Sequence, residues 1–351
     1  MNEPILEPEL PIIDAHFHFW LYSEATLASL SETMTLSARA MLPVIRKRPR
    51  YLLDEYLRDL QTGHNIRAAV HVDAHAMYKS SGPPELRSLG EVEFANGVAA
   101  MSGSGAFGEI RVCAAIIGGG VDLTLGDAVE PILMAHIAAG GGRYRGLRAW
   151  PIYDTDSTIS AFGNSHVLLD SRFRSGFRHL HRLGLSFDVF VLEPQLPDVI
   201  DLARAFPETV IILNHLGTPI GVGHYAGKRQ ERFPIWRDNI RTLSGCSNVA
   251  VKLGGIGSHF SGFGYGQATE PLTSTRLADD WRPYIETCIE AFGASRCMFE
   301  SNFPVDAAAG PYAMLWNAFK RITRNATPAE KAALYSGTAA RIYRLDLGIE
   351  A

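Results

Sequence analysis

Eight short apolar runs, separated by segments with helical spacing, constrain the fold of this 351-residue chain more than any other feature. They lie at Ile12–His18, Ala68–Val72, Val112–Ile117, Gly146–Trp150, Ser186–Leu192, Val210–Asn214, Val249–Leu253 and Cys297–Glu300. Strands that are apolar along their length are typical of a parallel sheet covered by helices on both faces. Eight of them predict an α/β fold, a (β/α)8 TIM barrel, rather than an open doubly wound sheet.

The segments between the runs predict helices and several long loops. Helices are expected at 54–60, 127–139, 172–183, 197–206, 281–292 and 311–322, from apolar spacing and from terminal Asp, Pro and Gly residues. Loops are expected at 22–51, 74–108, 217–238 and 254–279, all after the carboxyl ends of strands, where barrel enzymes build their sites. Residues 1–10 are expected to be an unstructured leader, and residues 11–351 one catalytic domain with long loop insertions.

Composition narrows the class of partner. The net charge is -4, which gives no basic surface for nucleic acid or anionic membrane. The chain has no apolar stretch of eighteen residues, no secretory signal pattern and no C-x-x-C pair among its four cysteines. We therefore expect a cytoplasmic protein that acts on a small molecule, with a homo-oligomer left open because such barrels often associate through their outer helices.

Three histidines follow strand-like runs. His16 and His18 are two residues apart at the end of the first run, and His215 directly follows the sixth. Alternate residues of a strand point to the same face, so His16 and His18 should emerge together. In a barrel all three would meet at one rim, where imidazoles bind a metal ion or a substrate oxygen. The alternative is a set of hydrogen-bonded core histidines.

Polar residues also follow the eighth run. Strand parity puts Glu300 and Asn302 on one face, with Asn302 nearer the mouth. A carboxylate inside a barrel is costly unless it is paired or functional, so Glu300 is either a base or ligand, or the structural partner of a buried cation or histidine. Asp306 lies beyond Pro304 and either reaches the site or caps the helix expected from Pro311.

Two cations lie at strand ends. Arg148 and Lys252 could hold a substrate carboxylate or polarise a carbonyl oxygen. The alternative is an ion pair with Glu300, Asp188 or Glu193. Further candidates for lining a substrate pocket are His75, Trp20, His259 and Tyr265.

The segments Ile13–Trp20, Asn214–Gly217 and Ser301–Pro304 together resemble the amidohydrolase superfamily. More narrowly, they resemble its amidohydrolase-2 branch of TIM-barrel hydrolases, which includes sugar lactonases and 2-pyrone-4,6-dicarboxylate lactonase. The resemblance runs from about Pro11 to the final segment Ser336–Tyr343. The segments Gly90–Met101 and Phe299–Asp306 resemble an uncharacterised subgroup of this branch.

The resemblance implies that His16, His18 and His215 bind metal or substrate. Two family residues are missing: the run at 186–192 contains no histidine, and Asn302 stands where the family has an aspartate that serves as metal ligand and base. Asparagine cannot accept the proton. Glu300 is therefore the expected base, with Asp306 as second choice. A single divalent ion, best zinc, on His16, His18 and His215 is left open alongside a metal-free site.

The function expected from these residues is hydrolysis of a lactone or similar cyclic ester of a small carboxylated molecule by activated water. One alternative keeps the fold but changes the reaction to a lyase that decarboxylates or hydrates an aromatic or enoic acid. Another, motivated by the two missing family residues, is a non-catalytic binding protein on the same scaffold.

Overall fold

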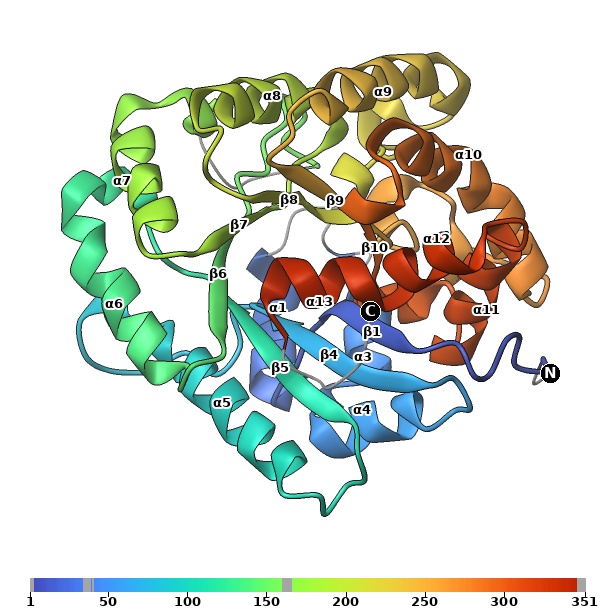
Figure 1. The fold of residues 1–351 in the computed structure, drawn as a ribbon, viewed down its shortest axis with the longest axis horizontal. Coiled ribbons are helices and arrows are strands. Elements are labelled where there is room, and N and C mark those ends of the chain that lie inside the picture. The colour runs from blue at the N-terminus through green and yellow to red at the C-terminus, as the bar shows by residue number, and fades with distance from the viewer. Residues whose placement is uncertain (1–2, 34–38, 40, 160–165, 346–351) are drawn as a thin grey trace.

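Eight parallel strands form a barrel in this computed structural model, which describes residues 3–33, 39, 41–159 and 166–345 (Figure 1). In sheet order they are β1 (Ile12–Phe17), β4 (Ile66–Val72), β5 (Arg111–Gly118), β6 (Tyr144–Ala149), β7 (Ser186–Val189), β8 (Ile211–Leu213), β9 (Val249–Leu253) and β10 (Cys297–Phe299). Each strand pairs in parallel with its neighbours in this order, which is the order of the chain. The predicted TIM barrel is confirmed.

Helices surround the sheet. They are α1 (Glu24–Thr33), α3 (Leu42–Lys47), α4 (Leu53–Leu60), α5 (Leu89–Gly103), α6 (Glu130–Ala139), α7 (Ser171–Arg182), α8 (Leu196–Ala205), α9 (Arg229–Ser244), α10 (Ser274–Phe292), α11 (Tyr312–Ile322), α12 (Pro328–Ala332) and α13 (Thr338–Tyr343). A short antiparallel pair, β2 (Trp20–Leu21) and β3 (Arg50–Tyr51), brackets the insertion after β1. Part of that expected loop, 34–38 and 40, lies outside the described residues.

The expected loop at 74–108 is wrong over Leu89–Gly103, which forms α5. Three glycines, Gly90, Gly97 and Gly103, weaken the helical pattern of this segment because glycine is a poor helix former. At Gly90 an added Cβ would lie 2.3 Å from the Met77 carbonyl oxygen, so close packing requires a residue without a side chain there. Tertiary packing thus overrides local propensity. The expected loop at 217–238 likewise contains the start of α9.

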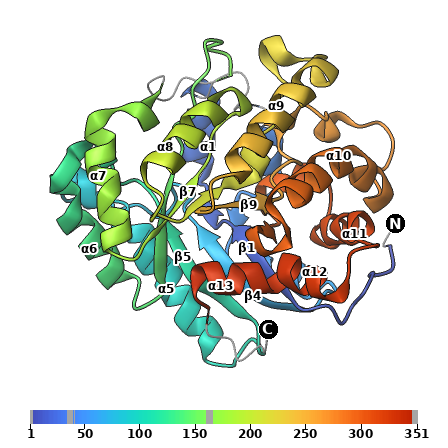
Figure 2. The ribbon, with the colours of Figure 1, turned by 45° about the horizontal axis from the view of Figure 1, so that its top comes forward.

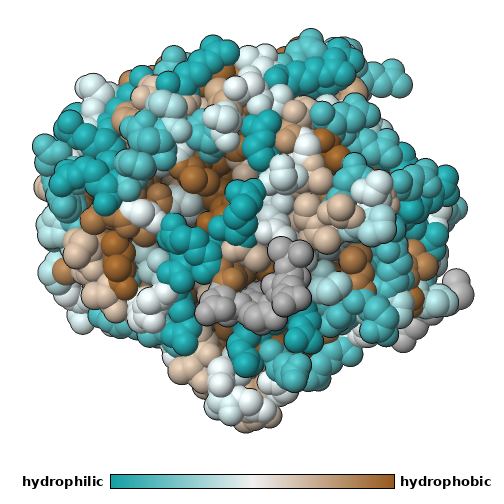
Figure 3. All heavy atoms as spheres, viewed as in Figure 1, coloured by the Kyte–Doolittle hydropathy of each residue, from teal (hydrophilic) through white to brown (hydrophobic). Residues whose placement is uncertain are grey.

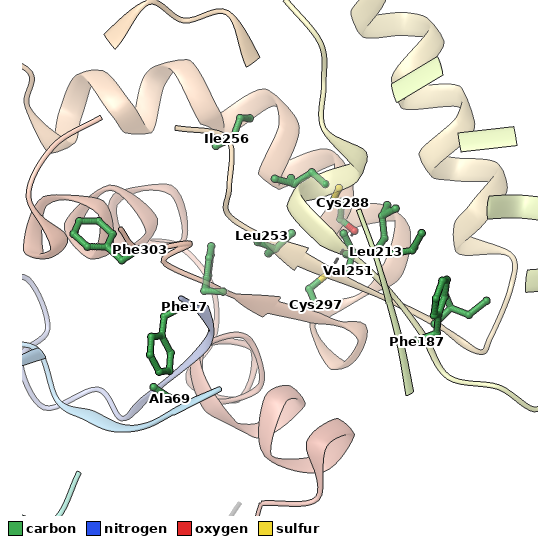
Figure 4. Packing of buried hydrophobic residues seen from close by; sticks show 14 of the residues in the cluster. Phe17, Ala69, Phe187, Leu213, Val251, Leu253, Ile256, Cys288, Cys297 and Phe303 are labelled. Carbon is green, nitrogen blue, oxygen red and sulfur yellow. Dashed lines mark hydrogen bonds between the residues drawn. The ribbon is translucent and has the colours of Figure 1, made fainter. Parts of the chain in front are cut away.

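The core has an outer and an inner part. The larger cluster lies between strands and helices, and Figure 4 shows Leu213, Val251 and Cys297 of neighbouring strands within it. A smaller cluster contains alternate strand residues, including Ile212, Ala250 and Met298, together with Tyr343 of α13. Two positions further along the same three strands stand Asn214, Lys252 and Glu300, all buried. Because side chains alternate along a strand, an apolar layer is followed by a polar layer toward the carboxyl ends.

Hydrogen bonds that Asp14 accepts join β1 to the segment after β10. The two end strands of the sheet do not form a ladder, and one isolated bridge, Phe17 to Phe303, links β1 to the segment after β10. The buried Asp14 carboxylate accepts hydrogen bonds from the Ser301 amide (2.8 Å) and hydroxyl (2.6 Å). It also accepts from the hydroxyls of Tyr56 (2.8 Å) and Tyr312 (3.0 Å). The pairing register is irregular between Asp14 and Phe17, so Asp14 faces the helices although His16 faces the interior.

Helix α13 covers the amino-terminal end of the barrel (Figures 1 and 2). Thr338 donates a hydrogen bond to the Ala294 carbonyl just before β10, and Arg145 at the start of β6 donates to the Tyr343 carbonyl. On the face seen in Figure 3, hydrophobic residues are interspersed among hydrophilic ones. Among the described residues, none of the helices has the length and apolar character needed to cross a lipid bilayer.

Residues 3–10 differ from the expected unstructured leader. Lys320 of α11 donates hydrogen bonds to the carbonyls of Leu6 and Glu7, both at 2.8 Å. Asn317 donates to the Pro4 carbonyl and accepts from the Leu6 amide. Backbone groups paired with a helix in this way hold the segment in place, which composition alone did not indicate. Residues 1 and 2 of the leader lie outside the described part of the chain.

We expect Asp14→Asn to lower the free energy of unfolding by about 3 kcal/mol or more, because an amide turns a donor toward groups that themselves donate. Urea denaturation measures the change. The matched control is Asp54→Asn, an exposed aspartate paired with Arg50 at 3.3 Å, which should cost less than about 1 kcal/mol. Equal losses in the two variants would show that Asp14 does not stabilise the junction between β1 and the segment after β10.

Candidate active site

Three histidines and a glutamate meet at the carboxyl ends of β1, β8 and β10. His16 lies in β1, His18 follows it, and His215 and Glu300 directly follow Leu213–Asn214 and Phe299. The ring centroids of His16 and His215 are 4.8 Å apart, although the residues are distant in sequence. The Glu300 carboxylate lies against both rings, with Oε1 2.7 Å from His215 Nδ1 and Oε2 2.9 Å from His16 Nδ1. All four side chains are buried.

A directed chain of hydrogen bonds fixes the imidazole tautomers. His18 Nδ1 lies 2.8 Å from the Val72 carbonyl, which only accepts, so this nitrogen carries the hydrogen. Its Nε2 then presents a lone pair to His16 Nε2 at 3.1 Å. On the other side of His16, Nδ1 is 3.2 Å from the Lys252 ammonium, which only donates. Without a metal, Lys252 therefore donates a hydrogen bond to His16, His16 donates to His18, and His18 donates to the Val72 carbonyl.

Lys252 forms an ion pair with Asp188 in addition to its contact with His16. Its ammonium lies 3.2 Å from the Asp188 carboxylate, and both side chains are fully buried. Tyr343 of α13 donates from its hydroxyl to the same carboxylate at 3.0 Å. One of the alternatives for Lys252, an ion pair with Asp188, is thus present, and the lysine also contacts His16. These contacts join α13, at the amino-terminal end of the barrel, to the histidine cluster.

Burial and charge together set the protonation of the cluster. Burial lowers the pKa of His16, His18 and His215 well below the ordinary value, and the nearby charge of Arg148 lowers each further. These imidazoles are therefore neutral, the form that binds metal ions. Burial raises the pKa of Glu300 to about 8, although Lys252 and Arg148 oppose this rise.

Asn302 and Asp306 form a separate pair beside the cluster. Asn302 Nδ2 donates to Asp306 Oδ1 at 2.8 Å, and the Gly257 amide donates to Asp306 Oδ2 at 2.9 Å. Burial raises the pKa of Asp306 to about 8, against these two hydrogen bonds. Asp306 therefore lies at the site rather than at the start of α11, which begins at Tyr312. Asn302 Oδ1 is buried without a partner among the described residues.

Arg148 lies buried between two aromatic rings. Its guanidinium carbon is 4.8 Å from the Trp150 ring centre and 5.3 Å from that of Phe190. One nitrogen donates to the Asp73 carbonyl at 2.8 Å, whereas Nε has no partner among the described residues. His75, half exposed, stacks on the Trp150 ring with a centroid distance of 4.2 Å. The arrangement leaves a donor of Arg148 for an anionic ligand.

Glu91 of α5 holds the end of β4, a role that sequence reasoning did not find. Its carboxylate accepts hydrogen bonds from the amides of Ala74 and Ala76, both at 2.9 Å. The adjacent carbonyls of Val72 and Asp73 receive His18 and Arg148, as described above. Glu91 thereby fixes the backbone that orients two candidate site residues.

The remaining candidates lie elsewhere. Trp20 is buried and donates from its indole nitrogen to the Arg48 carbonyl at 2.7 Å, a structural contact of the insertion after β1. His259 and Tyr265 line a cavity beside the barrel mouth. Glu193, an alternative partner for the buried cations, pairs with Arg232 instead.

Glycines of the loop after β9 leave room for the side chains of the site, and sequence reasoning missed this role. A Cβ on Gly254 would lie 2.3 Å from the Glu300 carbonyl oxygen, and one on Gly255 would lie 2.0 Å from His215 Nδ1. Gly255 also has a φ of 68°, and His215 itself has a φ of 54°. The Gly-Gly-Ile-Gly sequence directly after an apolar run was a usable signal, because such spacing allows close backbone approach.

The donor set fits a divalent ion. Zinc ligands at about 2.1 Å in tetrahedral geometry stand roughly 3.4 Å apart, close to the 3.1 Å between the Nε2 atoms of His16 and His18. Donor atoms of His16, His215 and Glu300 also lie within 4.8 Å of one another. Glu300 Oε2 is buried without a hydrogen-bond partner among the described residues, and it could accept from His16 Nδ1 once Nε2 binds an ion.

Comparisons with known proteins agree on one family. The family model described as Amidohydrolase matches residues 13–345. An uncharacterised protein of Sinorhizobium fredii is 33% identical over 96% of this chain and 99% of its own length. An L-fucono-1,5-lactonase of Burkholderia multivorans is 28% identical over 95% of this chain and 96% of its own. A solved amidohydrolase from Burkholderia multivorans with bound zinc has a TM-score of 0.70 and 25% identity, covering 95% of this chain and 99% of that one.

We expect Gly255→Ala to destabilise the protein more than Gly264→Ala does. Both positions have left-handed backbone, with φ of 68° and 70°, so both variants pay a similar conformational cost of roughly 1–2 kcal/mol. Only at Gly255 does the new methyl group meet the His215 ring, whereas nothing lies within 4 Å at Gly264. Urea denaturation of the two variants measures the difference. Equal destabilisation would show that the His215 ring moves away from the new methyl group without a loss of stability.

Proposed function

We propose that this chain, which belongs to the amidohydrolase family, is a hydrolase that opens a lactone or cyclic ester of a small carboxylated substrate with an activated water. The observation that carries the proposal is the buried cluster of His16, His18 and His215 around Glu300, whose Oε2 atom lacks a hydrogen-bond partner among the described residues. The lactonase name of a full-length relative at 28% identity supports the substrate class.

In this mechanism Glu300 is the general base. A water molecule at the unpartnered Oε2 loses its proton to the carboxylate while its oxygen attacks the lactone carbonyl carbon. The bond from that carbon to the ring oxygen then breaks, and the proton passes to the departing ring oxygen. The product is an acyclic hydroxy acid, so one water is consumed and no other co-reactant is needed. Asp306, also buried at the mouth, is the second candidate for the base.

The neighbouring groups bind and orient. Arg148 is held in place by the Asp73 carbonyl and by the Trp150 and Phe190 rings, and its unpartnered Nε donates to a substrate carboxylate. His18 cannot rotate freely because Val72 holds its Nδ1 hydrogen. A divalent ion, best zinc, would be held by His16, His18 and His215, which leaves the Glu300 carboxylate as the base, and it would supply Lewis-acid polarisation of the carbonyl.

Hydrolysis is tested by acid release from a panel of sugar lactones and pyrone-type lactones. We expect turnover in the native protein and a fall in kcat of about 10²-fold or more in Glu300→Gln, as for loss of a general base. Asp306→Asn is the matched variant, because it also neutralises a buried carboxyl at the site. A larger loss in Asp306→Asn than in Glu300→Gln would transfer the role of base to Asp306.

Two other outcomes would replace the proposal. Release of carbon dioxide from a panel of aromatic acids, with no acid release from lactones, would identify a lyase on the same scaffold. No turnover in either panel, combined with lactonase activity in Asn302→Asp, would indicate a binding protein in which the catalytic aspartate has been replaced by asparagine.

We also expect one zinc ion per chain after removal of metals with a chelator and dialysis against zinc. Elemental analysis measures the ratio, and cobalt substitution gives an absorption spectrum that reports the ligands independently of turnover. His16→Asn should lower zinc affinity by at least tenfold because it removes a ligand. His75→Asn, a half-exposed histidine outside the cluster, is the control and should keep native affinity. No zinc bound by the native protein would contradict the proposed metal.

A further inference from the structure

A cavity of about 720 Å³ lies beside the barrel mouth. Its walls come from the insertion after β1 and from the loops after β6, β8, β9 and β10. Polar side chains lining it are Lys47, Arg48, Thr158, Ser258, His259 and Gln267, and much of the rest is glycine. The volume falls in the range of sites for drug-sized ligands, larger than a single lactone ring needs.

The charge of the cavity is one-sided. None of the described residues that line it is an aspartate or glutamate, although two carry positive charge. Arg48 is paired with Asp59 at 3.2 Å. The exposed Lys47 ammonium, at the end of α3, forms no hydrogen bond or ion pair with another described residue. Both ring nitrogens of His259 are likewise buried without a partner in the described part of the chain. Lys47 and His259 therefore have hydrogen-bonding capacity left for a ligand.

The cavity adjoins the catalytic cluster through the loop after β9. Gly257 lines the cavity, and its amide donates a hydrogen bond to Asp306. Two residues earlier, Gly255 packs against the His215 ring. Val305 and Ala307, the neighbours of Asp306 in the chain, line the cavity as well. A ligand that spans both sides of Asp306 would thus occupy the cavity and the histidine cluster together.

We propose that this cavity binds an anionic group, a carboxylate or a phosphate, at the far end of the substrate whose ring carbonyl lies at the histidines. Lys47 supplies the charge, and His259 and Gln267 supply hydrogen bonds. The inference rests on the proposed function for the identity of the reacting end. It narrows the substrate class to elongated lactones with a second anion, distinct from the carboxylate that Arg148 receives.

The test is calorimetric titration of the whole protein with three six-carbon acids that share a carboxylate at one end. Gluconate ends in a hydroxyl, glucarate in a second carboxylate and 6-phosphogluconate in a phosphate. We expect at least one of the two probes with a second anionic group to bind about tenfold more tightly than gluconate, with an advantage that falls as salt rises. Whichever of these two probes shows the larger gain identifies the anion. Equal affinity for all three acids, including no binding of any, would overturn the proposal.

Matched variants locate the effect. Lys47→Gln should bring the affinities of glucarate and 6-phosphogluconate to within about twofold of that of gluconate, and His259→Gln should weaken the binding of these two probes only. Arg46→Gln removes the same charge one residue earlier on α3, at an exposed position that does not line the cavity, so it should keep the tenfold preference. An equal loss in Arg46→Gln and Lys47→Gln would assign the preference to general surface charge, and the proposal would fail.

The titration needs no turnover, which separates this proposal from the proposed function. If no lactone is hydrolysed while the Lys47-dependent preference persists, the anion site stands and the lactonase assignment fails. If lactones are hydrolysed while the three acids bind equally, the lactonase stands and the anion site fails.

Discussion

The closure of the barrel depends on a buried carboxylate that reinforces sparse strand pairing. β1 and the segment after β10 share one isolated bridge and the backbone hydrogen bond from His18 to the Phe303 carbonyl, and Asp14 accepts hydrogen bonds from Ser301, Tyr56 and Tyr312 at this seam. An unpaired carboxylate in the interior would cost several kcal/mol, so the donors must all arrive together. The same seam sets His16 beside Glu300, because the Asn302 amide donates to the His16 carbonyl at 2.9 Å. Closure of the fold and placement of the site residues therefore depend on the same contacts.

Charge balance explains the state of the histidines. Two cations, Lys252 and Arg148, lie in the interior with two carboxylates. Asp188 pairs with Lys252, and the Glu300 carboxylate lies close enough to both cations for them to oppose the rise of its pKa that burial causes. In this setting a protonated imidazole would add a further buried cation, so His16, His18 and His215 stay neutral. Neutral rings that are locked by Val72 and Glu300 can bind an ion or a substrate oxygen without first losing a proton.

Features with local sequence signals were predictable. The eight strands follow from apolar runs, and the interior position of Glu300 follows from parity with Met298. The partners of those residues were not predictable, because Asp14, Glu91 and Tyr343 act through contacts with segments remote in the chain. No local pattern shows that an aspartate in a strand will face helices while the histidine two places on faces inward. That difference comes from the irregular register between Asp14 and Phe17.

The contact between Tyr343 and Asp188 has a consequence for biosynthesis. Asp188 holds Lys252, which in turn faces His16, so the electrostatic environment of this histidine is completed by a residue of α13, far away in the sequence. While the helix that carries Tyr343 is still being translated, Asp188 lacks its phenol donor. The nascent polypeptide therefore completes the contacts behind the histidine cluster only after residue 343 has been added.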